Sequence, residues 1–322
     1  MAIKINWKDL QKRIINWVEV EKVMYNWVQI RPESTPPIWD DYLCFTAVTS
    51  SSTVKLDKDS GSSPSYTPSF QLEVSTDKEN WSDYTIGTTI TLSNIWDKVY
   101  WRNKSTTQTE FSSPSNINNY WRFYMTWSIT AWGDVNYLLC KNSTTTLFPS
   151  GEYVFQHLFY QCSSLITPPS LPATTLSIDC YQGMFAESWI TTLPQLPAMT
   201  LAEGCYADMF SYCNSVTSMV QLPATTLAKS CYYGMFYYCR GLTNIVELPA
   251  TTLPDYCYYE MFDHTNIELW TASDEPPAWW YSYRIPTSWT ATAGNNSLYR
   301  MFSNWYGPGI MNKDLYINCP VI

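Results

Sequence analysis

The sequence predicts a mixed α/β protein: an N-terminal β meander and a small β-sandwich, followed by a repeat solenoid with one strand and one short helix per unit. Three observations support this prediction. Residues 3–33 alternate apolar and polar side chains, residues 38–115 contain several short strand-like runs, and a motif of 25–26 residues recurs between residues 140 and 306. The expected domains are a meander at 1–35, a sandwich at 36–120, a capped solenoid at 121–306 and a C-terminal cap or tail at 307–322.

The meander is predicted from Asn-Trp pairs that recur every ten residues between Val- and Ile-rich segments. A two-residue hairpin turn prefers Asn-Gly, because its central residues adopt positive φ angles that are costly for a residue with a Cβ. The Trp of each pair is therefore expected in an exposed turn, on one rim that serves for docking. These residues are Trp7, Trp17 and Trp27.

Trp also stands at other places where turn chemistry favours Gly, namely Trp96, Trp132, Trp189 and Trp305. The chain has 16 Trp and 11 Gly in 322 residues, which is about half the usual share of Gly. One hypothesis is that many of these positions descend from Gly through a reassigned TGA codon. The alternative is that the chain builds its turns with Trp, and the codons of the gene distinguish the two.

Composition narrows the classes of function. Charged residues make up only 15% of the chain, against about a quarter in ordinary soluble domains. The net charge of −9 argues against nucleic acid as the main partner. Residues 1–31 hold six basic and three acidic side chains (+3), whereas residues 140–306 hold five and twelve (−7), so we expect the two ends to meet different partners. No apolar run has the length of a membrane span, and residues 1–10 lack a signal-peptide core, so neither a membrane nor ordinary secretion is expected.

The repeat is defined by two motifs in alternation. "LPATTL" stands at 171–176, 222–227 and 248–253, with "LPAMTL" at 196–201, and Cys-Tyr-x-x-Met-Phe follows each one. The segments 154–159 and 298–302 read as degenerate first and last copies. Leu176, Cys180 and Met184, at i, i+4 and i+8, predict one face of a helix, and the Pro-ended second half of each unit predicts a strand. Eight of the ten Cys recur with this period, which indicates buried thiols rather than disulfides.

These units resemble the BspA-type leucine-rich repeats of Bacteroides surface proteins and of crAss-like phages that infect such bacteria, over about half of the chain. The basic segment that opens with "IKIN" is similar to N-terminal segments of phage structural proteins. The resemblance implies a non-enzymatic protein of the phage surface, in a tail fibre, tail tip or capsid decoration. Residues 1–35 would then contact other virion proteins, and the solenoid would bind a host-surface glycan or protein. A homotrimer suits a fibre, although no coiled-coil pattern encodes one.

Two other functions remain open. A bacterial cell-surface adhesin can carry the same repeats. A virion-associated glycan hydrolase needs paired carboxylates, and Asp208 and Glu260 share one repeat offset two units apart, or about 10 Å. His264 beside Asp263 lacks a nucleophile motif, and sequence neighbours are not expected to face each other. No nucleotide, metal or cofactor motif is found, so no enzyme, cofactor or metal is predicted.

The candidate binding residues follow from the repeat geometry. One exposed position of each strand recurs along a solenoid and forms a continuous surface, while Tyr combines a flat ring with a hydroxyl and suits glycans or protein loops. The alternative is that these Tyr only cover the convex side. The strand candidates are Thr192, Gln195, Thr217, Gln221, Asn244 and Glu247, and the helix candidates are Tyr212, Tyr233, Tyr237, Tyr238 and Tyr259.

Overall fold

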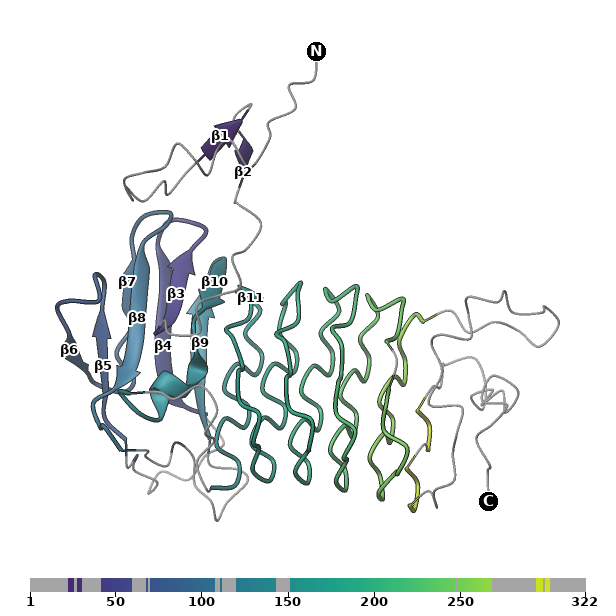
Figure 1. Cartoon of the computed structure of the whole chain (residues 1–322). Helices are drawn as coiled ribbons and strands as arrows, with labels where there is room; N and C mark the ends of the chain where they lie inside the picture. The colour runs from purple at the N-terminus through teal and green to yellow at the C-terminus, as the bar shows by residue number, and fades with distance from the viewer. Residues whose placement is uncertain are drawn as a thin grey trace, which may run out of the picture. The chain divides into compact units, whose positions relative to one another are not determined.

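The structure is a computed structural model, shown in Figure 1, in which the chain divides into two compact units, Met1–Ile38 and Trp39–Ile322. It describes residues 23–25, 28–30, 42–59, 68, 70–107, 111, 120–142, 151–246, 248–267, 294–297 and 299–301. Over these ranges the secondary structure consists of strands, turns and one short 3-10 helix.

The first unit contains one described hairpin, made of β1 (Val23–Tyr25) and β2 (Val28–Ile30). The strands are antiparallel, and Tyr25 lies opposite Val28, so that two residues connect them. This register confirms the hairpin predicted around Asn26 and Trp27. Trp7, Trp17 and Trp27 themselves lie outside the described residues.

The second unit begins with two sheets. One has the strand order β11-β10-β3-β8-β5-β6 and the other the order β7-β4-β9. Alternation of buried and half-buried residues along β4 marks a strand with one face on the core. The strands are β3 (Leu43–Ala47), β4 (Ser52–Lys58), β5 (Leu72–Ser75), β6 (Ser82–Tyr84), β7 (Ile90–Leu92), β8 (Lys98–Asn103), β9 (Trp121–Thr126), β10 (Ile129–Trp132) and β11 (Leu165–Thr167), and the 3-10 helix η1 is Val135–Leu138.

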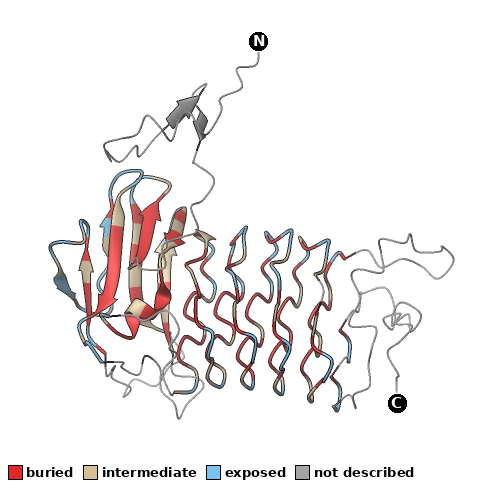
Figure 2. Cartoon of the chain, in the orientation of Figure 1, coloured by how far each residue is buried: buried red, intermediate tan, exposed pale blue. Residues whose placement is uncertain are grey.

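Aromatic side chains join the two sheets into a sandwich. Phe45 of β3 and Phe123 of β9 meet edge to face with their ring centroids 4.8 Å apart, and Trp101 of β8 lies 5.2 Å from the same Phe123. All three rings are buried, as Figure 2 shows for the strands that carry them. Burial of such large rings is the main source of stability for a sandwich of this size.

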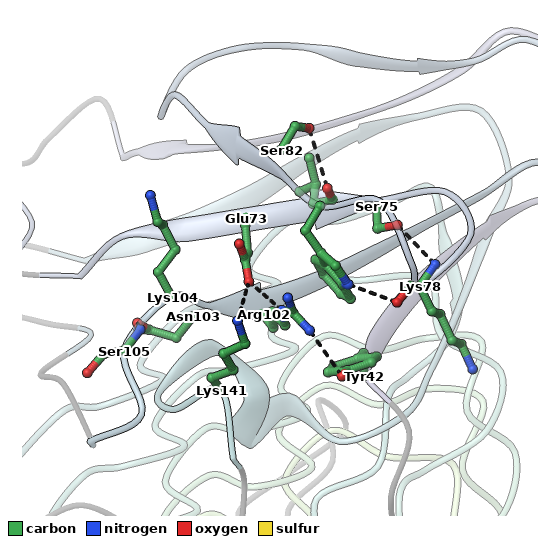
Figure 3. Close-up of polar contacts among 12 residues, drawn as sticks. Tyr42, Glu73, Ser75, Lys78, Ser82, Arg102, Asn103, Lys104, Ser105 and Lys141 are labelled. Carbon is green, nitrogen blue, oxygen red and sulfur yellow. Dashed lines mark hydrogen bonds and ion pairs between the residues drawn. The ribbon is translucent and has the colours of Figure 1, made fainter.

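The opposite face of the six-stranded sheet carries a closed polar cluster (Figure 3). Arg102 donates a hydrogen bond to Glu73 over 2.5 Å, and its guanidinium carbon lies 3.6 Å from the ring centroid of Trp81. Lys141 approaches the same carboxylate at 3.4 Å. Because both cations are bound to the buried carboxylate of Glu73 and an aromatic ring covers Arg102, we regard the cluster as structural.

The sandwich continues directly into the repeats. β10 pairs in parallel with β11, which belongs to the first repeat coil. The backbone N–H of Phe123 donates to the carbonyl of Leu158 (2.8 Å), and the rings of Phe123 and Phe159 stack with centroids 5.4 Å apart. The strands of the sandwich and the first coil therefore share one hydrophobic core.

The predicted strand-plus-helix repeat, and with it the mixed α/β class, is wrong. No α-helix occurs among the residues that the structure describes, and the fold is essentially all-β. Each Cys-Tyr segment is instead a chain of four-residue turns. Asp179, Gly183 and Glu187 have φ angles of 51°, 57° and 57°, which no α-helix contains. A turn that repeats every four residues also brings i, i+4 and i+8 to one face, so the spacing that predicted a helix has another cause.

Backbone hydrogen bonds stack these turn segments on one another. The N–H groups of Asp179 and Tyr181 donate to carbonyls of the next coil over 2.9 and 3.0 Å, whereas the N–H of Gln182, between Tyr181 and Gly183, donates three residues back over 3.1 Å. The same alternation recurs in the later coils. Every second N–H thus joins two coils and the others close turns, which satisfies the buried backbone without a helix.

The repeat core is a set of columns of identical side chains. Tyr181, Tyr206, Tyr232 and Tyr258 stack with centroids 5.7–5.9 Å apart. The eight cysteines from Cys140 to Cys257 are buried and form no disulfide, as predicted. The two degenerate copies are also confirmed: the first coil bonds to the next through the N–H of Phe155 (2.8 Å), and the N–H of Phe262 donates to Met301 in the last described coil (2.8 Å).

Candidate recognition surfaces on the repeats

The predicted strand positions form a polar surface. Thr192, Gln195, Thr217, Gln221 and Asn244 are all exposed, whereas Glu247 lies outside the described residues. In successive coils they follow the buried residues Ile190, Val216 and Leu242, which keep the coils in register. Short hydroxyl and amide groups therefore recur across the stack, as the sequence predicts.

The structure brings the five predicted tyrosines together on the turn side of the same coils. Tyr212 stacks on Tyr238 with centroids 4.9 Å apart and ring planes 14° apart. In a second column, Tyr233 stacks on Tyr259 at 4.8 Å and 5°. Tyr237 meets Tyr212 and Tyr238 edge to face at 5.6 and 4.7 Å. We call this aromatic surface the tyrosine columns.

Two further residues extend these columns and were missed in the sequence. His264 stacks on Tyr238 at 4.1 Å, and Tyr299 stacks on Tyr259 at 5.2 Å. Each occupies the same repeat offset as the residue that it covers, so alignment of the degenerate units would have found both. The columns cross three successive coils, and the coil spacing places their rings in contact.

Charged groups lie beside the columns on the last coils. The Nδ1 atom of His264 lies 2.7 Å from a carboxylate oxygen of Asp263, so the expectation that these sequence neighbours do not face each other is wrong. Arg300 contacts Asp263 at 2.8 Å and Glu260 at 3.0 Å. Asp263 is fully buried and therefore holds the imidazole and the guanidinium in place.

Asp208 lies one coil before Gly234, and its carboxylate occupies the space that a Cβ of Gly234 would need. Burial, and then the charge of Glu260, raise the pKa of Asp208 to about 6. Burial also raises the pKa of Glu260, although Arg300 opposes this shift. The charges of Asp208 and Glu260 therefore interact across the coil of Gly234, as their shared repeat offset predicts.

A surface pocket of about 330 Å³ lies between two LPATTL-type segments. It is lined by Thr174, Thr175, Leu176, Pro197, Met199 and Thr200, among others, and none of its lining residues is charged. In the described part of the chain, no group of three or more His, Cys, Asp or Glu residues is placed to hold a metal ion. No helix of this part has the length and hydrophobicity needed to cross a membrane.

No protein family, curated protein or solved structure matches the chain. The function is therefore argued from the geometry of the repeats. Stacked rings beside hydroxyls and carboxylates can bind a ligand that presents apolar faces and hydrogen-bond donors. The carboxylates of Glu260 and of the buried Asp263 both bind Arg300, which fixes this guanidinium beside the columns.

Proposed function

We propose that this chain is a non-enzymatic structural and adhesion protein of a phage virion, in a tail fibre, tail tip or capsid decoration. Its repeat stack binds a host-surface glycan or protein. The observation that carries this proposal is the pair of aromatic columns that continue across three coils without entering the core. The phage assignment rests on the resemblance of the repeats and of the N-terminal segment.

The tyrosine columns suit recognition because their rings are held in place before a ligand arrives. The central ring of each column is stacked on both sides and the outer rings on one side, so binding orders few side chains and loses little entropy. Tyr238 and Tyr259 are half-buried, and Tyr212 and Tyr299 are exposed at the ends of their columns. A ligand that spans several coils can therefore contact a row of rings.

Host-cell binding by the purified full chain tests this function. We expect Tyr238→Ala and Tyr259→Ala each to weaken binding about tenfold, because each substitution removes the central ring of a column. Met199→Ser changes an exposed side chain of the same stack away from the columns and serves as the matched control. Binding that is unchanged in the Tyr variants would contradict the proposal.

Location tests the virion assignment separately. Mass spectrometry of purified virions is expected to find this chain. If it is absent there and present in a bacterial outer-membrane fraction, the chain is a bacterial adhesin instead.

The raised pKa of Asp208 favours one second candidate, a virion-associated glycan hydrolase. A general acid needs such a pKa, but its partner at the same repeat offset, Glu260, is bound to Arg300. Incubation with envelope polysaccharides decides between the two functions. Depolymerisation that disappears in Asp208→Asn and Glu260→Gln would establish the hydrolase, and we expect no depolymerisation by the unmodified chain.

A further inference from the structure

Two exposed tryptophans flank the end of strand β3 in the sandwich. The backbone N–H of Trp96 donates to the carbonyl of Ala47 over 2.9 Å, on the side of β8. On the side of β10, the N–H of Val48 donates to the carbonyl of Ser128 over 2.8 Å, directly after Trp127. The side chains of Trp96 and Trp127 are 44% and 66% exposed. They therefore stand at one end of the six-stranded sheet, two strands apart.

A third exposed tryptophan continues this row onto the repeats. Ile129 of β10 pairs with Leu165 of β11. The N–H of Thr191 then donates to the carbonyl of Ile166 over 2.9 Å, which places the second coil beside β11. Trp189, two residues before Thr191, is 64% exposed. Trp189 therefore stands at the same end of the sheet, two strand positions beyond Trp127.

The spacing of the three indoles follows from the strand order. Neighbouring strands lie about 4.8 Å apart, so rings on every second strand recur at about 10 Å. We call Trp96, Trp127 and Trp189 the tryptophan row. Such a distance is too large for the rings to cover one another and is comparable to the repeat of a disaccharide in an extended polysaccharide.

Two members of the row are held in a strained backbone conformation. Trp96 and Trp127 have φ angles of 74° and 60°, a region that large side chains seldom adopt. Strain of this kind is unfavourable and concentrates at functional sites, including those that bind ligands. Burial of the rings does not offset this backbone strain, because both side chains are exposed.

The surroundings of the row select the chemistry of the ligand. Asn94, Thr126 and Thr191 are exposed, and each lies one or two residues along the chain from one of the rings. The carboxylate of Asp97 accepts a hydrogen bond from the backbone N–H of Asn94 over 2.8 Å, so it is engaged within its own loop. An exposed amide or hydroxyl residue therefore accompanies each ring of the row.

A protein partner fits this row poorly. A stable protein–protein interface buries about 800 Å² on each partner around a continuous apolar centre. Rings about 10 Å apart, each accompanied by a polar residue, do not make such a centre. A sugar chain instead presents separate apolar ring faces bordered by hydroxyls, in the same alternation.

We propose that the tryptophan row is a binding site for an extended, neutral polysaccharide, with each indole stacked on the apolar face of one sugar ring. This proposal rests on the proposed function, because it assumes that the chain binds glycans. The site itself lies on a surface separate from the tyrosine columns. It also gives the junction between sandwich and repeats a role, since ligand would span both.

Affinity electrophoresis of the full chain in gels that contain xylan, galactomannan, hydroxyethylcellulose or dextran tests this site. We expect at least one of these polysaccharides to retard the chain. Each of Trp96→Ala, Trp127→Ala and Trp189→Ala should weaken retardation about three- to tenfold, and the triple variant should migrate as in a gel without polysaccharide. Met199→Ser, which alters an exposed side chain away from the row, should leave retardation unchanged.

Three results would overturn the proposal. They are migration of the unmodified chain unaffected by all four polysaccharides, retardation that persists in the triple variant, and a change of oligomeric state in that variant without any effect in the gels. The last result would make the row an interface between copies. Tyr238→Ala and Tyr259→Ala provide the distinction from the proposed function: they should lose host-cell binding and keep retardation in the gels. A defect of the Tyr variants alone would leave the proposed function standing without this site.

Discussion

Single residues in left-handed backbone decide much of this structure. The prediction that Trp96 stands where Gly is favoured is confirmed by its φ of 74°, and Trp127, which sequence reasoning did not select, has a φ of 60°. For Trp132 and Trp189 the prediction is wrong, since neither has a positive φ. Trp305 lies outside the described residues. A codon-level origin of these Trp stays a prediction that the gene sequence tests.

Replacement of the strained tryptophans by Gly is expected to stabilise the protein. Trp127→Gly should raise the free energy of unfolding by about 1 kcal/mol, because relief of left-handed strain exceeds the added entropy of the unfolded chain. Trp189→Gly is the control: its φ is not positive, so only the entropic loss remains and stability should fall. Urea denaturation measures both, and a loss of stability in Trp127→Gly would contradict the strain argument.

The carboxyl of Asp208 links stability to pH. Its pKa is raised to about 6 in the folded chain from 3.8, so the folded state holds the proton more tightly than the unfolded state. The contribution of Asp208 to the free energy of unfolding is therefore fully present below pH 3.8 and is lost as pH rises through about 6. Asp208→Asn should stabilise the protein at pH 7, by roughly 1–3 kcal/mol, and have a smaller effect at pH values below the ordinary pKa of Asp.

Titration of His157 changes the stability of the fold in the opposite direction to that of Asp208, over an overlapping range of pH. Burial lowers its pKa from 6.5 to about 4, so its contribution is present above pH 6.5 and lost as pH falls through about 4. Thermal unfolding of the unmodified chain and of Asp208→Asn across this range separates the two groups. An Asp208→Asn curve parallel to that of the unmodified chain would show that Asp208 has an ordinary pKa.

At the scale of the element, the repeat coil replaces a helix by four-residue turns tied to the next coil. The thiol of Cys213 shows how side chains support this arrangement. Its Sγ donates to the carbonyl of Phe185 in the preceding coil over 3.0 Å, and burial raises its pKa to about 12, which keeps the proton in place. Cys239 makes the same bond to the carbonyl of Phe210 in the preceding coil over 2.9 Å, and Cys162 donates to the carbonyl of Phe123 in strand β9 over 2.8 Å.

Loss of this thiol is expected to weaken the contact between coils. Cys213→Ala removes the donor and leaves a small cavity, and should lower the free energy of unfolding by about 1–3 kcal/mol. Cys213→Ser keeps a donor and should cost less, because Ser188 already occupies the equivalent position of the preceding coil. Equal losses in the two variants, measured by urea denaturation, would show that the bond contributes nothing.

The period of the coils was predictable, and their internal conformation was not. Recurrence of Leu-Pro and Cys-Tyr motifs indicated the register, including the degenerate copies, and the Val- and Ile-rich runs indicated the sheets. The i, i+4, i+8 spacing, however, is shared by helices and four-residue turns. A partial signal was Gly or Asp at some of the positions four residues apart, as in Asp179, Gly183, Gly204 and Asp208, because these residues tolerate positive φ, whereas Tyr, Glu and His occupy other positions of the same kind.

The tyrosine columns could be predicted from the sequence, whereas the tryptophan row could not. Residues of one column share a repeat offset, so the sequence placed the tyrosines together. Trp96, Trp127 and Trp189 share no offset. Their alignment depends on the strand order β8-β3-β10-β11, in which the outer strands are far apart in sequence, and no local pattern encodes that order.

At the scale of the second unit, sandwich and repeats share a core, and each coil contacts mainly its two neighbours. Stability of such a stack is a sum of coil and interface contributions. Insertion of a second copy of residues 231–256 directly after residue 256 should therefore give a folded chain with a higher midpoint of thermal unfolding. The inserted coil repeats the Cys, Tyr, Met and Phe columns on both of its sides. A lower midpoint would contradict additive stacking.

The hydrogen bonds between turn segments also give the stack a direction. In the four-residue turn segments between Tyr153 and Phe262, the backbone N–H groups that join coils donate to carbonyls of the following coil; backbone bonds in the other direction, such as that from Thr191 to Ile166, lie outside these segments. Aligned peptide groups add their dipoles, as they do along a helix. The repeat is therefore electrically polarised, with amide hydrogens facing its later end and carbonyl oxygens its earlier end. Any chain that continues the stack must therefore add to it in one orientation. A twofold pairing of two identical ends would place partial charges of the same sign against each other.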